Sequence, residues 1–170
     1  MSLTVRELTQ IPFLRTRMHA GAAGAQRVIS WAHVTEMARP WEWLEKGDLL
    51  MTVGLGIPLT PADQVAYIES LAAVEVSGLA IGEHMHAPPL SDAMLAAADR
   101  RALPILITAF EVPFIQISRT VAAASQPVTR RRASGTLGSA RLAITRCSRG
   151  GRWSSRKVMP SWIGPDSITW

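Results

Sequence analysis

The chain has 170 residues, of which 48% are hydrophobic, so it holds enough apolar material for one folded domain and is not a wholly disordered chain. No apolar run approaches the roughly 20 residues that a membrane-spanning helix needs, and the first residues lack the apolar stretch of a signal peptide. These features predict a cytoplasmic protein with no membrane partner. Cys147 is the only cysteine, which excludes an internal disulfide and a cysteine metal cluster.

The net charge of +5 is the average of two unlike regions. Residues 1–127 contain 9 Lys+Arg against 12 Asp+Glu, whereas residues 128–170 contain 9 Lys+Arg against 1 Asp+Glu. The high pI therefore belongs to the second region. We predict one domain over residues 1–125 and an irregular, disordered basic tail over residues 126–170.

A short helix, a turn and two strands are predicted before residue 60. The helix can be capped by Ser2 or Thr4. The first strand is rich in β-branched and aromatic residues, and the second is a short apolar run that stops at Gly54. These elements lie at residues 3–9, 21–24, 27–35 and 48–53.

Helices and strands then alternate. Thr60 can cap a helix, Pro61 suits the first helical position, and Gly78 is expected to end that helix. Ser91 is expected to cap the next helix, and Pro113 to open the last one. The strands between them lie at residues 79–82 and 104–108.

This alternation predicts the α/β class. Short, wholly apolar strands between amphipathic helices are typical of a parallel sheet that is covered on both faces. We therefore expect a small Rossmann-like fold, with a parallel or mostly parallel sheet of about four strands and flanking helices.

Several motifs, in order along the chain, resemble one known family. They read VRELTQIPFL, RVISWAHVTE, WLEKGDLLMTVGLGI, VSGLAIG and ALPILITAFEVPFIQI, at residues 5–14, 27–36, 43–57, 76–82 and 102–117. Together they are similar to the N-terminal regulatory domain of PucR-type (purine catabolism regulator) bacterial transcription factors. The resemblance covers about the first 125 residues and implies a signal-sensing domain that regulates purine or nitrogen-compound catabolism, and not an enzyme.

Members of this family usually continue into a helix-turn-helix that binds DNA, and no motif of that region is found here. The resemblance therefore implies no specific DNA binding by this chain alone. Its motifs stop where Arg, Ser, Gly and Trp begin to dominate the composition, which favours a truncated or frameshifted product after about residue 125. A small-molecule effector and a second copy of the chain are the candidate partners, and no cofactor is expected.

Polar residues and glycines at the carboxyl ends of the predicted strands form the candidate ligand site. Open α/β sheets bind ligands at this edge. A carboxylate at a strand exit, as at Glu36, could hold an amide or amine group of an effector. The predicted ligand-binding residues are Thr35, Glu36, Thr52, Gly54, Gly82 and Thr108.

Three smaller signals each allow two interpretations. Gly54 and Gly56 could cradle a phosphate, but Pro58 removes a donor and a tight turn is favoured. His84 and His86 could bind a metal, but apart from the adjacent Glu83 no carboxylate or cysteine completes the set, and an exposed loop is favoured. His33 could sense pH or contact a ligand, and a packed histidine is favoured.

Two functions of other classes stay as alternatives. One is a small-ligand or metal-binding α/β enzyme domain, although no nucleophile and base stand at catalytic spacing and no catalytic residue is assigned. The other is a nucleic-acid binder that acts through the basic tail. The cluster of Trp31, Trp41 and Trp43 is equally consistent with a partner interface and with core packing.

Overall fold

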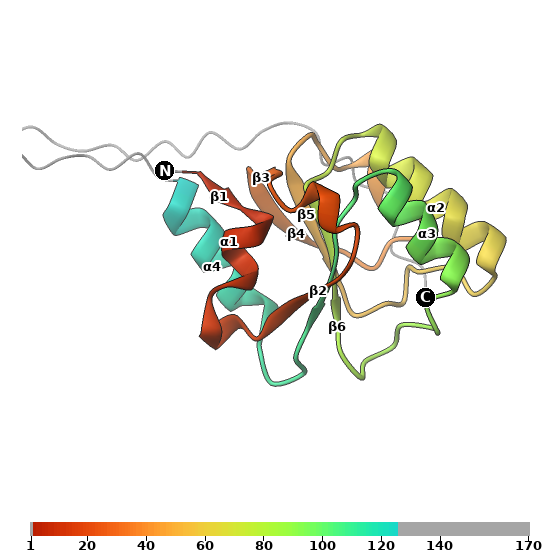
Figure 1. The fold of residues 1–170 in the computed structure, drawn as a ribbon. Coiled ribbons are helices and arrows are strands. Elements are labelled where there is room, and N and C mark those ends of the chain that lie inside the picture. The colour runs from red at the N-terminus through yellow and green to blue at the C-terminus, as the bar shows by residue number, and fades with distance from the viewer. Residues whose placement is uncertain (1, 126–170) are drawn as a thin grey trace, which may run out of the picture. The chain divides into compact units, whose positions relative to one another are not determined.

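The computed structural model describes residues 2–125, and the predicted tail over residues 126–170 lies outside the described residues. A five-stranded sheet with strand order β2-β7-β6-β5-β4 forms the centre of the fold (Figure 1). The four strands from β4 to β7 are parallel, and β2 runs antiparallel to β7. The strands are β2 (Thr16–Ala20), β4 (Trp31–Val34), β5 (Asp48–Thr52), β6 (Gly78–Gly82) and β7 (Ile105–Thr108).

Helices cover both faces of this sheet, which confirms the predicted α/β class and mostly parallel sheet (Figure 1). Successive residues of a strand point to opposite faces. Leu50 accordingly joins the core beneath α2 (Pro61–Ala73) and α3 (Asp92–Arg100), whereas Leu49 and Met51 join the core beneath α1 (Val5–Thr9) and α4 (Phe114–Ser125).

The predicted helix caps are confirmed. The hydroxyls of Thr4, Thr60 and Ser91 each accept a hydrogen bond from a backbone N–H in the first turn of α1, α2 and α3. Thr4 and Glu7 form a reciprocal capping box. Such caps satisfy N–H groups that have no partner within the helix, so they fix where each helix begins.

The predicted end of one helix is wrong. Helix α2 ends at Ala73 and not at Gly78, because Glu75 turns the chain with a positive φ of 56°. Gly78 is instead the first residue of β6, where a Cβ would lie 3.1 Å from the carbonyl oxygen of Pro104. A glycine here serves close packing between strands and does not stop the helix.

The single strand predicted over residues 27–35 is two strands. Val28–Ile29 forms β3, which pairs antiparallel with β1 (Leu3–Thr4), and β4 begins only after Ser30. Strand β2 has no counterpart in the prediction. Its sequence, TRMHA, is mixed in polarity because only its first and last residues are buried.

Candidate functional site

The carboxyl ends of four parallel strands meet at one edge of the sheet, as expected for the predicted ligand site. Thr35 and Glu36 follow β4 directly, and Thr52 is the last residue of β5. Gly82 and Thr108 are the last residues of β6 and β7 and lie opposite one another in register. The structure therefore places all six predicted residues at this edge.

Glu36 is the centre of a hydrogen-bond network at the exit of β5. Its carboxylate accepts bonds from the Thr52 hydroxyl at 2.6 Å, from the Val53 N–H at 2.6 Å and from the Leu55 N–H at 3.0 Å. The Thr52 hydroxyl in turn accepts a bond from the Gly54 N–H at 2.9 Å. Glu36 thus fixes the loop after β5, because a carboxylate that accepts several N–H and O–H bonds holds its donors in one geometry.

The glycines of that loop form a turn. Gly54 has a φ of +105°, and a Cβ there would meet the backbone of Ala87. The loop after β6 is held against it by a bond from the His86 N–H to the Val53 carbonyl oxygen at 2.9 Å. The N–H groups of Gly54 and Leu55 already have partners, which favours the tight-turn interpretation over a phosphate cradle.

The other predicted residues are less accessible or already paired. The hydroxyls of Thr108 and Thr16 share a hydrogen bond of 3.0 Å, and both residues are buried. Gly82 is buried against the side chain of Met85. The Thr35 hydroxyl accepts a bond from the Met37 N–H at 3.3 Å.

A pocket of about 490 Å³ opens beside this network, between the loop after β5 and helix α2. Trp41 and Tyr67 form its aromatic wall, packed edge to face with ring centroids 5.6 Å apart. The pocket is lined mostly by apolar groups, and Asp63, Ser70 and Tyr67 are among the few residues that bring a polar group to it. Such a lining suits a small, largely apolar ligand.

Tyr67 lines this candidate pocket but was not predicted from the sequence, although it is the only tyrosine in the chain. Burial raises the pKa of the Tyr67 phenol, and the negative charge of Glu36 raises it further. The phenol is therefore a protonated donor at neutral pH. Trp41 comes from the cluster whose role was left open, and it packs at the pocket, whereas Trp31 and Trp43 are 48% and 70% exposed.

The histidines stand apart from this pocket. The Nε2 atom of His33 lies 3.4 Å from a carboxylate oxygen of Asp48. Residues 2–125 contain no group of three or more His, Cys, Asp or Glu side chains that could hold a metal ion. In the same part of the chain, every helix is too short or too polar to cross a membrane.

Comparison with known proteins identifies the family to which the chain belongs. Residues 7–124 match the model of the purine catabolism regulatory protein-like (PucR) family. Over 123 residues the chain is 42% identical to the transcriptional activator PmfR of Paenarthrobacter nicotinovorans. That alignment covers 72% of this chain and 26% of the relative, so the chain spans about a quarter of the relative's length. With its mostly parallel sheet and its similarity to a transcriptional activator, the chain belongs to the PucR family of regulatory proteins.

Proposed function

We propose that residues 2–125 form the effector-sensing domain of a transcriptional regulator and that the effector binds in the pocket between Trp41, Tyr67 and the loop after β5. The observation that carries this proposal is the position of the pocket. It opens at the carboxyl edge of the sheet, directly beside the loop that Glu36 holds in place. This edge is where open α/β folds bind small molecules.

In this proposal Thr35, Glu36, Thr52 and Gly54 form the frame of the site. The hydrogen bonds of Glu36 and Thr52 hold the loop after β5, whose residues Leu55 to Pro58 line the pocket. The Thr35 hydroxyl accepts its bond from the Met37 N–H, within the segment that follows β4. Gly82 and Thr108 extend the same edge on the next two strands. Direct contact with the effector falls to Trp41 and Tyr67, because these side chains lie in the pocket wall.

The lining indicates the class of effector. Aromatic and apolar walls favour a flat molecule without net charge, and the Tyr67 hydroxyl offers one hydrogen-bond donor. Because the matched family is named for purine catabolism, we propose a purine base or a related nitrogen heterocycle. The proposed role is regulatory and not catalytic, in keeping with the matched family and the activator it resembles.

We further propose that this chain does not read a DNA operator by itself. Within residues 2–125, helices α2 and α3 pack together against one face of the sheet, and α1 and α4 against the other. A helix-turn-helix needs two successive helices joined by a short turn, whereas strands separate successive α-helices in residues 2–125. Fluorescence anisotropy with labelled promoter DNA tests this, and the expected binding is weak, salt-sensitive and indifferent to sequence.

Thermal-shift assays on the full chain test the effector site. Xanthine, hypoxanthine and adenine serve as probes, and the expected result is a concentration-dependent rise in Tm. Tyr67→Phe removes only the hydroxyl, and Trp41→Leu removes part of the aromatic wall. Trp43→Leu is the matched control, because Trp43 is exposed and does not line the pocket.

The proposal requires that Tyr67→Phe and Trp41→Leu each reduce the ligand-induced rise in Tm while Trp43→Leu leaves it intact. A shift that survives both pocket substitutions would place the effector elsewhere. If none of the three probes shifts Tm even near its solubility limit, the purine assignment is wrong.

A further inference from the structure

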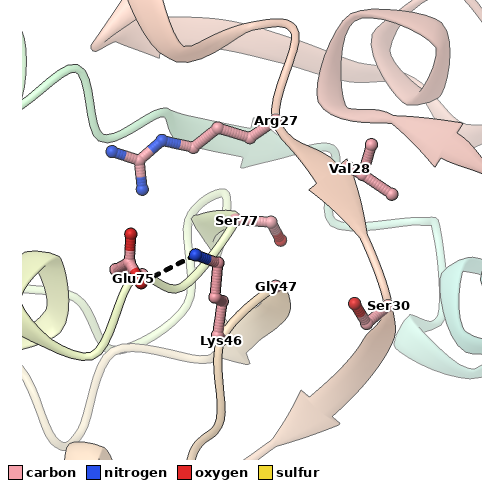
Figure 2. A pocket seen from close by; sticks show the side chains of 7 residues that line it. All are labelled: Arg27, Val28, Ser30, Lys46, Gly47, Glu75 and Ser77. Carbon is pink, nitrogen blue, oxygen red and sulfur yellow. Dashed lines mark ion pairs between the residues drawn. The ribbon is translucent and has the colours of Figure 1, made fainter.

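A second pocket, of about 570 Å³, lies at the opposite, amino-terminal edge of the parallel strands (Figure 2). Three of its lining residues directly precede neighbouring strands. Ser30 precedes β4, Gly47 precedes β5 and Ser77 precedes β6. The remaining lining comes mainly from three charged side chains, those of Arg27, Lys46 and Glu75.

These charged groups leave one positive charge in excess. Lys46 and Glu75 form an ion pair at 2.9 Å, so their charges largely offset each other. The Arg27 guanidinium donates to two carbonyl oxygens, of Val76 at 2.6 Å and of Arg101 at 3.1 Å. Carbonyl oxygens position the guanidinium without neutralising it, and further N–H groups of Arg27 stay available to a ligand.

Ser77 gives evidence for a binding site that is independent of the charges in the pocket. The residue is only 1% exposed, and its hydroxyl has no hydrogen-bond partner. Among the side chains of residues 2–125, no other buried nitrogen or oxygen atom lacks a partner. Figure 2 shows the hydroxyls of Ser77 and Ser30 turned into the pocket. A buried hydroxyl without a partner destabilises a fold, so a ligand that accepts its hydrogen bond would explain why it is there.

We propose that this pocket binds a small organic acid through a single carboxylate. The carboxylate would accept hydrogen bonds from the Arg27 guanidinium, in the planar arrangement that arginine favours, and from the Ser77 hydroxyl. One negative charge matches the excess positive charge of the pocket. A phosphate dianion would leave a net negative charge beside Glu75, so the carboxylate is the better match.

This site is separate from the effector pocket proposed above. The two lie at opposite edges of the sheet and share no lining residue. The acid pocket also adjoins the end of α4, because the Ser125 hydroxyl donates to the Ser30 carbonyl oxygen at 3.3 Å. A ligand here therefore lies beside the last helix of the matched family region.

NMR titration of the ¹⁵N-labelled full chain tests the proposal. Benzoate and succinamate are the probes, benzamide and succinamide are their uncharged counterparts, and inorganic phosphate at equal ionic strength is the anion control. We expect both acids to give saturable shifts at the amides of Ser30, Gly47 and Ser77. We expect benzamide, succinamide and phosphate to bind at least tenfold more weakly than the two acids. The loss of a charge-assisted hydrogen bond weakens binding by about that factor.

Two substitutions make the test specific to this pocket. Arg27→Gln should abolish the saturable shifts, and Arg119→Gln on the exposed face of α4 controls for the loss of one positive charge. Because Arg27 also holds two carbonyl groups, its loss could unfold the chain, and Ser77→Ala supplies a second variant. Ser77→Ala should raise Tm, because it removes the unpaired hydroxyl, yet weaken acid binding about tenfold.

Three results would overturn the proposal. The first is the absence of saturable shifts with either acid. The second is equal or tighter binding of the uncharged amides or of phosphate. The third is unchanged acid affinity in Ser77→Ala. Failure of the purine probes would leave these results unaffected, because those probes address the other edge of the sheet.

Discussion

The Glu36 carboxylate accepts a 2.6 Å hydrogen bond from the hydroxyl of Thr52, sixteen positions further along the chain. This bond joins the exits of two neighbouring parallel strands, β4 and β5. The same carboxylate also accepts bonds from the N–H groups of Val53 and Leu55. Glu36 therefore stabilises the protein's own loop. It affects a ligand indirectly, through the conformation of that loop.

Glu36→Ala should lower the free energy of unfolding by about 2–3 kcal/mol, because it leaves the Val53 and Leu55 N–H groups without their charged acceptor. Urea denaturation followed by circular dichroism measures this change. Glu42→Ala is the matched control. Glu42 pairs with Arg39 on the surface, so its loss should change the free energy by less than about 1 kcal/mol. Equal effects of the two substitutions would contradict the role given to Glu36.

Gly54→Ala should destabilise the fold more than Gly82→Ala. At Gly54 a methyl group would meet the Ala87 backbone, and the φ of +105° is unfavourable for any residue with a Cβ. At Gly82 the nearest atoms belong to the flexible side chain of Met85, which can move. We expect a loss of about 2–4 kcal/mol at Gly54 and about half as much at Gly82. Thermal unfolding of both variants decides the order.

Gln64 connects the loop after β5, which lines the effector pocket, to the loop after β6. It is fully buried, its side-chain amide donates to the carbonyl oxygens of Pro58 and Pro89, and its side-chain oxygen accepts from the Ser91 N–H. Gln64→Leu should lower the free energy of unfolding by about 1–3 kcal/mol, because three partly buried backbone groups lose the partners that the Gln64 side chain supplies. In Gln64→Leu the amide of Ser91 should exchange its hydrogen faster, because it loses its acceptor. The exchange rates of the β7 amides should change only by the amount that the lower global stability predicts.

The parallel strands and the helix starts could be predicted because their signals are local. Asp48–Thr52 is buried at every position, and its three central residues are all apolar. The Asp48 side chain accepts a hydrogen bond from the Glu45 N–H. Thr60 and Ser91 mark helix starts through side chains close to the N–H groups that they cap. Strand β2 could not be predicted in this way, because its pairing partner β7 lies far along the chain.

The candidate site was predictable only in outline. The rule that ligands bind at carboxyl ends of parallel strands selected Glu36 and Thr52, but it could not show that these two side chains bind each other. Tyr67 lies on a helix and belongs to no recognisable sequence motif. It lines the pocket because α2 packs against Trp41, and this contact could not be predicted from the sequence. The pocket at Ser77 lies at the amino-terminal edge of the strands, which that rule does not consider. The evidence for it is a buried hydroxyl without a hydrogen-bond partner, and no sequence pattern indicates such a group.

The ion pair between Lys46 and Glu75 predicts a pH dependence. The hydrogen bond and the positive charge of Lys46 lower the pKa of the Glu75 carboxyl below its usual value of 4.5, with a smaller contribution from Arg27. A lowered pKa in the folded state stabilises the fold above pH 4.5, and this contribution is lost as the pH falls through the folded-state pKa. In Lys46→Gln the pKa of Glu75, followed by NMR, should rise toward 4.5. An unchanged pKa would contradict the pairing.

The composition change after residue 127 yields a prediction about the gene. Only Asp166 is acidic in residues 128–170, and Lys157 is the only lysine among its nine basic residues. A natural nucleic-acid-binding arm would interleave lysine with arginine, and a natural linker would lack isolated tryptophans. We propose that out-of-frame translation accounts for both features. We therefore propose that another frame of the encoding DNA, shortly after codon 125, continues PucR-like sequence and reaches a helix-turn-helix. Sequencing that region tests this directly, and stop codons throughout the other two frames would refute it.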